Sequence, residues 1–145
     1  MYFISLYYIV AKDSRVHDLE YPSLINIHIF WDLATKKFES DSKYDQKHAC
    51  DKAYRAATEA VDVLLFAHGK YVPIGTPEAH IMRTKYLVEI QSLITEGQKI
   101  VNLYSLFKDH LHGAAYYSGL DPRSFSETFK QVGIFIEIIE NSIQN

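Results

Sequence analysis

From residue 24 onward, apolar and small residues recur at intervals of three and four, the spacing that places side chains on one face of an α-helix. The strongest pattern lies in residues 45–68, and its stripe consists of Ala49, Ala53, Ala56, Ala60, Leu64 and Ala67. Because most of these side chains are small, a neighbouring helix can pack closely against this face. Stripes of the same spacing predict further helices over 24–39, 78–95 and 98–117, and another after Asp121-Pro122.

Capping and turn residues separate these stripes. Ser and Asp side chains in residues 40–45 favour a helix start, and Gly69 favours a helix end. In Thr76-Pro77-Glu78 the hydroxyl is expected to cap the next helix, with the proline in its first turn. Gly97 is expected to end that helix, and Asp121-Pro122 is a second start of the same kind.

The connections between these helices are short, which predicts an all-α fold, an antiparallel bundle of four to five helices over residues 24–145. Residues 1–23 form an N-terminal apolar extension that begins MYFISLYYIV. A membrane-spanning helix needs roughly 20 apolar residues, and a secretory signal begins with a basic region, so neither is predicted. We expect the extension to dock on the bundle, as a strand or as a helix.

Charge and cysteine content narrow the function classes. The formal net charge is −3, so overall charge does not favour nucleic-acid binding, although a local basic strip is compatible with it. Cys50 is the one cysteine of the chain and is expected to be a small buried hydrophobic residue. A single cysteine cannot form an intrachain disulfide, which fits a reducing, cytoplasmic environment.

The segment KDHLHGAAYY, residues 108–117, concentrates polar chemistry at the end of a predicted helix. The core-facing stripe of that helix comprises Ile100, Tyr104, Phe107, Leu111 and Ala114. Beside it, Lys108, His112 and Tyr116 follow at intervals of four, and Asp109 is within helical reach of His112. No two histidines are four apart and no HExxH occurs, so no metal site is predicted. No cofactor is expected either.

Two interpretations fit this segment. In the first, His112 takes a proton from a ribose 2′-hydroxyl, Asp109 holds its tautomer, and Lys108 stabilises phosphate charge in metal-independent RNA cleavage. A tyrosine can also stack on a base, and a glycine leaves room for a ligand or a second helix beside His112. The candidate ligand-binding residues are Tyr116, Tyr117, Gly113 and His110, the last on the opposite side of the helix. In the second interpretation, the polar stripe is only the solvated border of an amphipathic helix.

Two stretches resemble the HEPN (higher eukaryotes and prokaryotes nucleotide-binding) superfamily. Residues 45–69, DQKHACDKAYRAATEAVDVLLFAHG, are similar to its first long, alanine-rich helix. Residues 111–119, LHGAAYYSG, are similar to its later helix, in which a histidine stands near a small residue and aromatics. The resemblance covers roughly residues 24–143 and is greatest to compact, stand-alone, archaeal-type members.

The resemblance implies a helical bundle that forms a homodimer. Many active members are metal-independent ribonucleases, often toxins paired with a nucleotidyltransferase antitoxin, and others are binding modules without activity. Their active motif is an arginine followed, after four to six residues, by a histidine, which His112 matches best. Residues 105–107 are Ser, Leu and Phe, so the sequence departs from the motif here, and Lys108 is the nearest cation. Lysine does not replace arginine where a phosphate is bound at two points.

Three functions are therefore considered. The missing arginine favours a dimeric nucleotide- or RNA-binding module, non-catalytic or weakly active, of the kind found in toxin–antitoxin pairs. The alternatives are a metal-independent endoribonuclease that uses Lys108 and His112, and a dimerisation or interaction scaffold. In the dimer, we expect residues 108–117 to line a cleft near the two-fold axis. Lys108 and His112 of both chains would then give local positive charge.

Two further features are assigned structural roles. The charged residues of the long helix are expected to form a solvated, salt-bridged face rather than a phosphate-binding strip. They are Lys47, Asp51, Lys52, Arg55, Glu59 and Asp62. Trp31, the one tryptophan of the chain, is expected to anchor the core or an interface.

Overall fold

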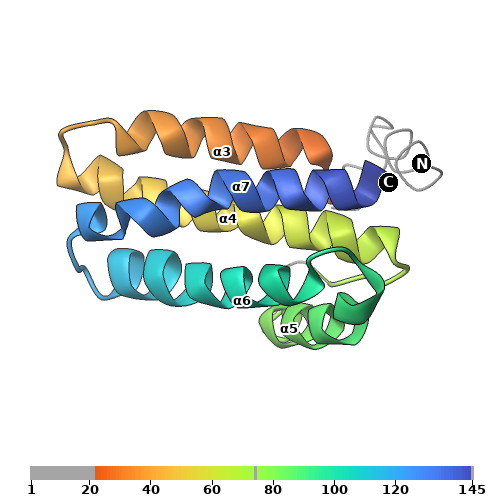
Figure 1. The fold of residues 1–145 in the computed structure, drawn as a ribbon. Helices are drawn as coiled ribbons and strands as arrows, with labels where there is room; N and C mark the ends of the chain where they lie inside the picture. Colours follow the sequence, from red (N-terminus) through yellow and green to blue (C-terminus); the bar gives the residue numbers. More distant parts are fainter. Residues whose placement is uncertain (1–21, 74, 145) are drawn as a thin grey trace.

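The computed structural model describes residues 22–73 and 75–144, and within these ranges it contains helices and no strand. The predicted all-α fold is confirmed, because the described residues form five α-helices packed as a bundle (Figure 1). The α-helices are α3 (Leu24–Phe38), α4 (Lys43–Ala67), α5 (Ala79–Ile90), α6 (Gly97–Phe107) and α7 (Ser126–Gln144). The apolar run MYFISLYYIV, and with it the choice between strand and helix, lies outside the described residues.

Three shorter segments complete the helices. A 3₁₀ turn, η1 (Gln91–Leu93), follows α5, a π-helix, η2 (Lys108–Tyr117), continues α6, and a second 3₁₀ turn, η3 (Pro122–Phe125), precedes α7. In Figure 1, α3, α4, α7 and the continuous helix α6–η2 run along the length of the bundle, and the shorter α5 lies at the end where α4 finishes. Since α4 contacts each of the other α-helices, it is the central element.

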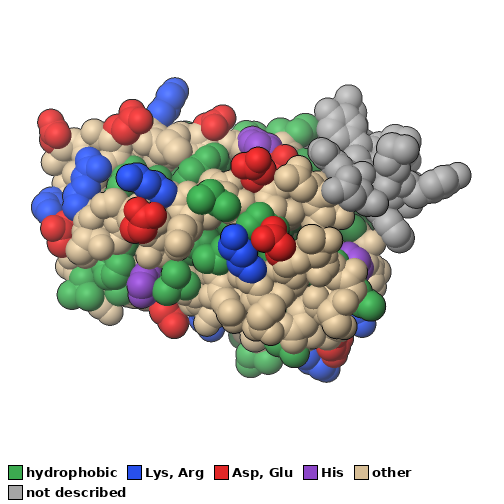
Figure 2. All heavy atoms as spheres, viewed as in Figure 1, with side chains coloured by type: hydrophobic (Ala, Val, Ile, Leu, Met, Phe, Trp, Pro, Cys, Tyr) green, Lys and Arg blue, Asp and Glu red, His purple; other side chains and the backbone are tan. Residues whose placement is uncertain are grey.

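The surface of the bundle is mixed in character. Figure 2 shows acidic and basic side chains interspersed with apolar ones over the face seen there, so charge of one sign does not dominate this view. None of the described helices combines the length and the apolarity that a membrane crossing requires.

Several predicted helix boundaries are confirmed. The side chain of Ser42 caps α4 by accepting a hydrogen bond from the N–H of Asp45. Gly69 follows the last turn of α4 with a φ of 75°, a left-handed conformation in which glycine is unstrained. This conformation lets the N–H of Lys70 reach back into the last turn of the helix. Asp121 caps η3 through its side chain.

At two predicted helix boundaries, the residue that was expected to cap or end the helix has a different role. Thr76 does not cap α5, because its hydroxyl donates to the carbonyl oxygen of Pro73 at 2.9 Å, and α5 begins after Glu78 without a side-chain cap. Gly97 does not end the preceding helix, since it is the buried first residue of α6. A Cβ at this position would collide with the backbone carbonyl of Gln91, so glycine is required by a close approach of two backbone segments.

The alanine stripe of α4 is buried as predicted. Ala49, Ala53, Ala56 and Ala60 are fully shielded from solvent, so α4 can occupy the centre of the bundle. Cys50 beside them is also fully buried, and burial, with a contribution from Asp51, raises the pKa of its thiol to about 12. A thiol with so high a pKa stays neutral, which confirms Cys50 as a small hydrophobic residue.

Aromatic side chains link the outer helices. Phe38 of α3 stacks on Phe129 of α7 with ring centroids 4.0 Å apart. Trp31 of α3, half-buried, lies 5.2 Å from the same ring, and a Cβ at Gly133 of α7 would stand 3.1 Å from its indole. Trp31 is therefore an anchor between α3 and α7, as predicted. A pair of this kind contributes about 1 kcal/mol beyond the area that it buries.

The π-helix changes which residues of 98–117 face the core. Ile100, Tyr104, Phe107 and Leu111 are buried as predicted, but the next buried residue is Ala115 instead of Ala114. In a π-helix the backbone hydrogen bonds join residues five apart, so each turn holds more residues than an α-helical turn. Successive steps of four therefore stay on the core face of η2.

Candidate functional site

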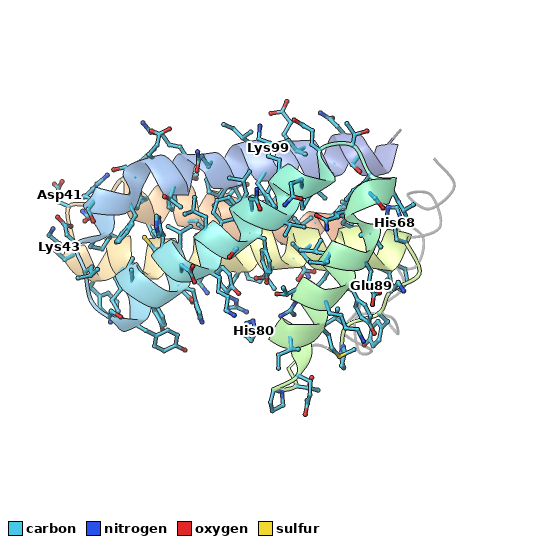
Figure 3. All side chains as sticks on the ribbon, turned by 60° about the horizontal axis from the view of Figure 1, so that its bottom comes forward. Asp41, Lys43, His68, His80, Glu89 and Lys99 are labelled. Carbon is cyan, nitrogen blue, oxygen red and sulfur yellow. The ribbon has the colours of Figure 1, made fainter. Side chains whose placement is uncertain are left out.

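A cleft of about 370 Å³ lies between α4, α5 and η2. Six of its lining residues belong to α4: Asp51, Tyr54, Arg55, Thr58, Glu59 and Asp62. His80 and Arg83 from α5, His112 from η2 and Phe30 from α3 complete the lining. Figure 3 shows His80 beside the start of α5, between the two ends of the bundle that Lys43 and His68 mark.

The predicted solvated, salt-bridged face on α4 is wrong for its three acids. Asp62 is only 4 % exposed, and Glu59 and Asp51 are half-buried. Each acid pairs with a group from another element: Asp62 with Arg83, Asp51 with His112, and Glu59 with a backbone N–H at the start of α3. Because these partners are 21 to 61 residues away in the sequence, helical spacing alone does not reveal them.

Arg83 and Asp62 form the base of the cleft as a two-point ion pair. The Nε of Arg83 donates to Oδ1 of Asp62 at 2.8 Å, and Nη2 donates to Oδ2 at 3.1 Å. Burial raises the pKa of Asp62 above its usual range, and the bonds from Arg83 offset part of this effect. The two charges neutralise each other, and the planar fork geometry fixes how both side chains are oriented.

Glu59 joins the cleft to the start of α3. Its Oε1 accepts a hydrogen bond from the N–H of Ser23 at 2.7 Å. Burial raises the pKa of Glu59 to about 7, and this rise exceeds the lowering that the bond from Ser23 produces. A carboxyl group with this pKa exchanges a proton readily at neutral pH.

His112 and His80 bring two imidazoles into the cleft from different elements. The Nδ1 of His112 lies 3.4 Å from Oδ1 of Asp51, a long hydrogen bond that orients the ring. The same ring stacks on Tyr54 at 4.7 Å. The ring centroid of His80 is 6.3 Å from that of His112, and its Nδ1 lies 3.5 Å from the hydroxyl of Tyr54.

The protonation of His80 is set by its surroundings. Burial lowers the pKa of His80, and the positive charges of Arg83 and Lys108 lower it further, as does His112. His80 is therefore mostly neutral at pH 7 and becomes protonated only in more acidic solution.

Hydroxyl groups of two neighbouring residues hold the Tyr54 side chain in place. The hydroxyl of Tyr54 lies 3.3 Å from that of Tyr104, which lies 3.3 Å from Oγ1 of Thr58. Burial raises the pKa of Tyr104 well above its usual range, so its hydroxyl keeps its proton. This chain of hydroxyls fixes the ring on which His112 stacks.

The structure places His112 in the cleft but gives it a different carboxylate partner. The predicted contact between Asp109 and His112 is wrong, and Asp51 occupies that role. Asp109 and Lys108 are exposed and line a separate hollow of about 180 Å³ beside Thr84. The wider π turn accounts for this difference. Three residues nearly complete an α turn but cover a smaller part of a π turn, so Asp109 and His112 point in more different directions.

The two predicted tyrosines lie beside His112. The ring of Tyr116 is stacked 6.3 Å from His112, and the ring of Tyr117 meets it edge to face at 4.8 Å. Tyr117 is 71 % exposed, so most of its surface is open to a ligand. Gly113 is half-buried, and a Cβ there would make only an ordinary contact, 3.4 Å from a carbonyl oxygen of its own helix.

His110 faces away from these residues. Its Nδ1 lies 3.0 Å from Oγ1 of Thr128, and its ring packs 5.2 Å from Phe125. The predicted orientation on the opposite side of the helix is therefore observed, and the structure does not bring His110 together with His112.

Sequence reasoning missed His80 and Arg83, and it misassigned the acids of α4. A signal for the cleft was present in α4, where polar residues recur at positions 51, 55, 58, 59 and 62 beside the stripe of small, buried residues. A polar stripe on a largely buried helix indicates a polar cavity or a set of polar partners. In α5, His80 and Arg83 are three residues apart and share one face.

The arrangement has the chemical elements for anion binding and proton transfer. It combines two imidazoles, two guanidinium groups, three carboxyl groups and several ring faces in one cleft. Among residues 22–73 and 75–144, no group of three or more His, Cys, Asp or Glu side chains is placed to hold a metal ion. The chain matches no protein-family model, no curated protein and no solved structure.

Proposed function

We propose that this protein is a nucleotide- or RNA-binding module and that the cleft between α4, α5 and η2 is its binding site. The observation that carries this proposal is the convergence of His80, His112 and Arg55 beside the ring of Phe30. The N–H donors of imidazole and guanidinium groups suit phosphate oxygens, and ring faces suit nucleobases. The resemblance to the HEPN superfamily supports the same class of ligand.

The acids of the cleft are compatible with an anionic ligand because each is compensated. Arg83 neutralises Asp62, and His112 lies against Asp51. Burial raises the pKa of Glu59 to about 7, so about half of the molecules carry it neutral at pH 7. The guanidinium of Arg55, 4.7 Å above the ring of Phe30, is exposed and can contact a phosphate.

The size of the cleft fits one nucleotide unit. Small-molecule sites range from about 300 to 1,000 Å³. At about 370 Å³ this cleft lies at the lower end, so it suits a single base with its sugar and phosphate.

Calorimetric titration with ribonucleoside monophosphates tests this proposal. We expect binding that weakens by roughly tenfold in His112→Ala and in Arg55→Ala, since each removes an N–H donor to the phosphate. Lys108→Ala should weaken binding less, because Lys108 influences the cleft through its charge near His80. His110→Ala is the matched control and should bind as the wild type does. Equal affinity in all four variants, or no binding by the wild type, would reject the site.

Metal-independent cleavage of RNA is the second candidate, and the His80–His112 pair favours it. His112, oriented by Asp51, would take the proton of a ribose 2′-hydroxyl, whose oxygen then attacks the adjacent phosphorus. His80 would give a proton to the departing 5′-oxygen. The products would be a 2′,3′-cyclic phosphate and a free 5′-hydroxyl, with one proton transferred in each direction and no net oxidation.

A labelled RNA oligonucleotide separates the two candidates. A nuclease would cut it in the presence of EDTA, and His112→Ala and His80→Ala would each abolish cutting. Because His80 must carry a proton and its pKa is lowered, the rate should fall as pH rises towards neutrality. If RNA binds but is not cut at any pH between 5 and 8, the nuclease is rejected and the binding module is retained.

The resemblance also supports partners of two kinds, a second copy of this chain and a nucleotidyltransferase of the toxin–antitoxin type. A small nucleotidyltransferase gene beside this one would support that pairing. Co-expression of the two proteins followed by size-exclusion chromatography would test it, and separate elution would reject it.

A further inference from the structure

We propose that an aromatic strip, formed by Tyr44, His48, Tyr116 and Tyr117, extends the cleft into a path for a single-stranded nucleic acid. This inference rests on the proposed nucleotide- or RNA-binding function and names the form of the ligand. It would make the cleft one subsite of a longer site, with bases stacked on the strip and one nucleotide held in the cleft.

The rings of the strip form a continuous series that ends in the cleft. Tyr44 lies 4.3 Å from His48, and His48 meets Tyr116 edge to face at 5.6 Å. Tyr116 and Tyr117 contact each other at 5.0 Å, and both lie against His112, which lines the cleft. No gap in the ring contacts therefore separates Tyr44 from the cleft within the described structure.

The geometry of α4 explains this continuity. Tyr44, His48, Asp51 and Arg55 follow at steps of four, three and four, so they occupy one face of the helix. The same face continues to Asp62 at the base of the cleft. At 1.5 Å per residue, Tyr44 and Asp62 are about 27 Å apart along the helix, which is longer than one nucleotide.

Exposure distinguishes this strip from core packing. Tyr44 is 68 % exposed and Tyr117 is 71 % exposed, whereas Tyr54, the core-facing tyrosine of α4, is 3 % exposed. Exposed tyrosines present large ring faces to the solvent. They are well suited to stacking on bases, because every base has a π-face.

Lysines beside the strip favour a polyanion. The Nζ of Lys47 lies over the ring of Tyr116, 5.4 Å from its centroid. Next to it is a hollow of about 450 Å³ that Lys43, Tyr44, Lys47 and Asp121 help to line. Lys43 is paired with Asp121 at 2.6 Å, so Lys47 is the cation best placed to contact a backbone phosphate. A proline-rich peptide also binds tyrosine-lined grooves, but such a peptide gains nothing from a lysine over the ring.

Fluorescence anisotropy with labelled ten-nucleotide RNA and DNA strands tests this path. We expect a strand to bind at least tenfold more tightly than a monophosphate, and a duplex of the same sequence to bind more weakly than the strand. The difference in affinity between the RNA strand and the DNA strand shows whether the site prefers ribose or deoxyribose. Tyr44→Ala and Tyr117→Ala should each weaken strand binding roughly tenfold, and Tyr44→Ala should leave monophosphate affinity unchanged. Lys47→Ala should lower the slope of log affinity against log salt by about 0.7.

The controls separate failure of the strip from failure of the cleft. Tyr71→Ala removes another exposed tyrosine, beyond the far end of α4, and should leave strand binding unchanged. If monophosphates bind but Tyr44→Ala and Tyr117→Ala have no effect on the strand, the strip is rejected and the cleft stands. If neither monophosphate nor strand binds, both proposals fail. Tight binding of a proline-rich peptide without strand binding would identify the strip as a peptide site instead.

Discussion

Arg83 and Asp62 meet in a two-point ion pair that is almost completely shielded from water. Their exposed fractions are 5 % and 4 %, and both N···O distances are 3.1 Å or less. Burying two charges costs free energy that their attraction only partly offsets, so such a pair is weak as a source of stability. Removal of one partner is strongly destabilising, because it leaves the other charge buried without compensation.

The first prediction concerns this pair. Asp62→Ala and Arg83→Ala should each lower the free energy of unfolding by about 3–5 kcal/mol. The double variant Asp62→Leu/Arg83→Met should lose less than either single variant, since it leaves no unpaired charge. Urea denaturation of the wild type and these three variants measures each loss of stability. As a control, Lys70→Ala breaks the exposed pair with Glu89 and should cost at most about 1 kcal/mol. A double variant that loses as much stability as either single variant would contradict the prediction.

Glu59 gives the protein a specific pH dependence. Burial raises its pKa from 4.5 to about 7. Between these pH values the folded protein keeps a proton that the unfolded chain has released, so the free energy of unfolding falls as pH rises. The wild type should therefore lose about 2–3 kcal/mol relative to Glu59→Gln between pH 4 and pH 8. Glutamine keeps an oxygen that can accept the bond from Ser23, so the comparison isolates the charge.

Chemical denaturation at a series of pH values measures this difference. Glu137→Gln changes an exposed acid on α7 and serves as the matched control, with a profile parallel to that of the wild type. Parallel profiles for the wild type and Glu59→Gln would show that Glu59 titrates alike in the folded and unfolded chain.

Gly97 should be intolerant of a side chain. A Cβ there would overlap the backbone carbonyl of Gln91, and backbone atoms cannot move aside as a flexible side chain can. Gly97→Ala should lower the free energy of unfolding by about 2 kcal/mol or more. Gly113→Ala places the same methyl group in a helix where space is available, and should be neutral or stabilise by up to about 1 kcal/mol. Thermal melts of both variants give the comparison, and similar melting temperatures would contradict it.

The expected homodimer has an apolar candidate surface on α3. Ile25, Ile29 and Leu33 follow at intervals of four and are 46 %, 50 % and 42 % exposed. Light scattering at micromolar concentration should give twice the chain mass, and Ile29→Asp should reduce it to one chain if α3 carries the contact. A wild-type mass of a single chain would exclude the dimer. The location of residues 108–117 near a two-fold axis stays a prediction.

The helices could be predicted because their signals are local. The stripe of small residues in α4 and the caps at Ser42 and Gly69 depend on neighbours within a few positions, and the structure places them as expected. The π-helix could not be predicted, since no local pattern in KDHLHGAAYY distinguishes it from an α-helix. This one difference moved the core contact from Ala114 to Ala115 and separated Asp109 from His112.

The candidate site was predicted only in part. His112 and its neighbouring tyrosines lie on one segment, and their proximity follows from spacing alone. Asp51 and His80 reach the same ring from two other helices, and the packing of those helices is decided by the whole core. Charge pattern on α4 was misleading for the same reason, because a polar residue on a helix can face water or a buried partner.

Trp31 has a practical consequence for future measurements. It is the one tryptophan of the chain, and its indole lies against Gly133 and Phe129 of α7. Tryptophan emission, excited selectively over that of tyrosine, therefore comes from a single indole seated at one helix–helix contact. If α3 separates from α7 while the remaining helices hold, the emission will shift to longer wavelength before the far-ultraviolet circular dichroism changes. The protein thus carries an optical probe for partial opening that requires no label.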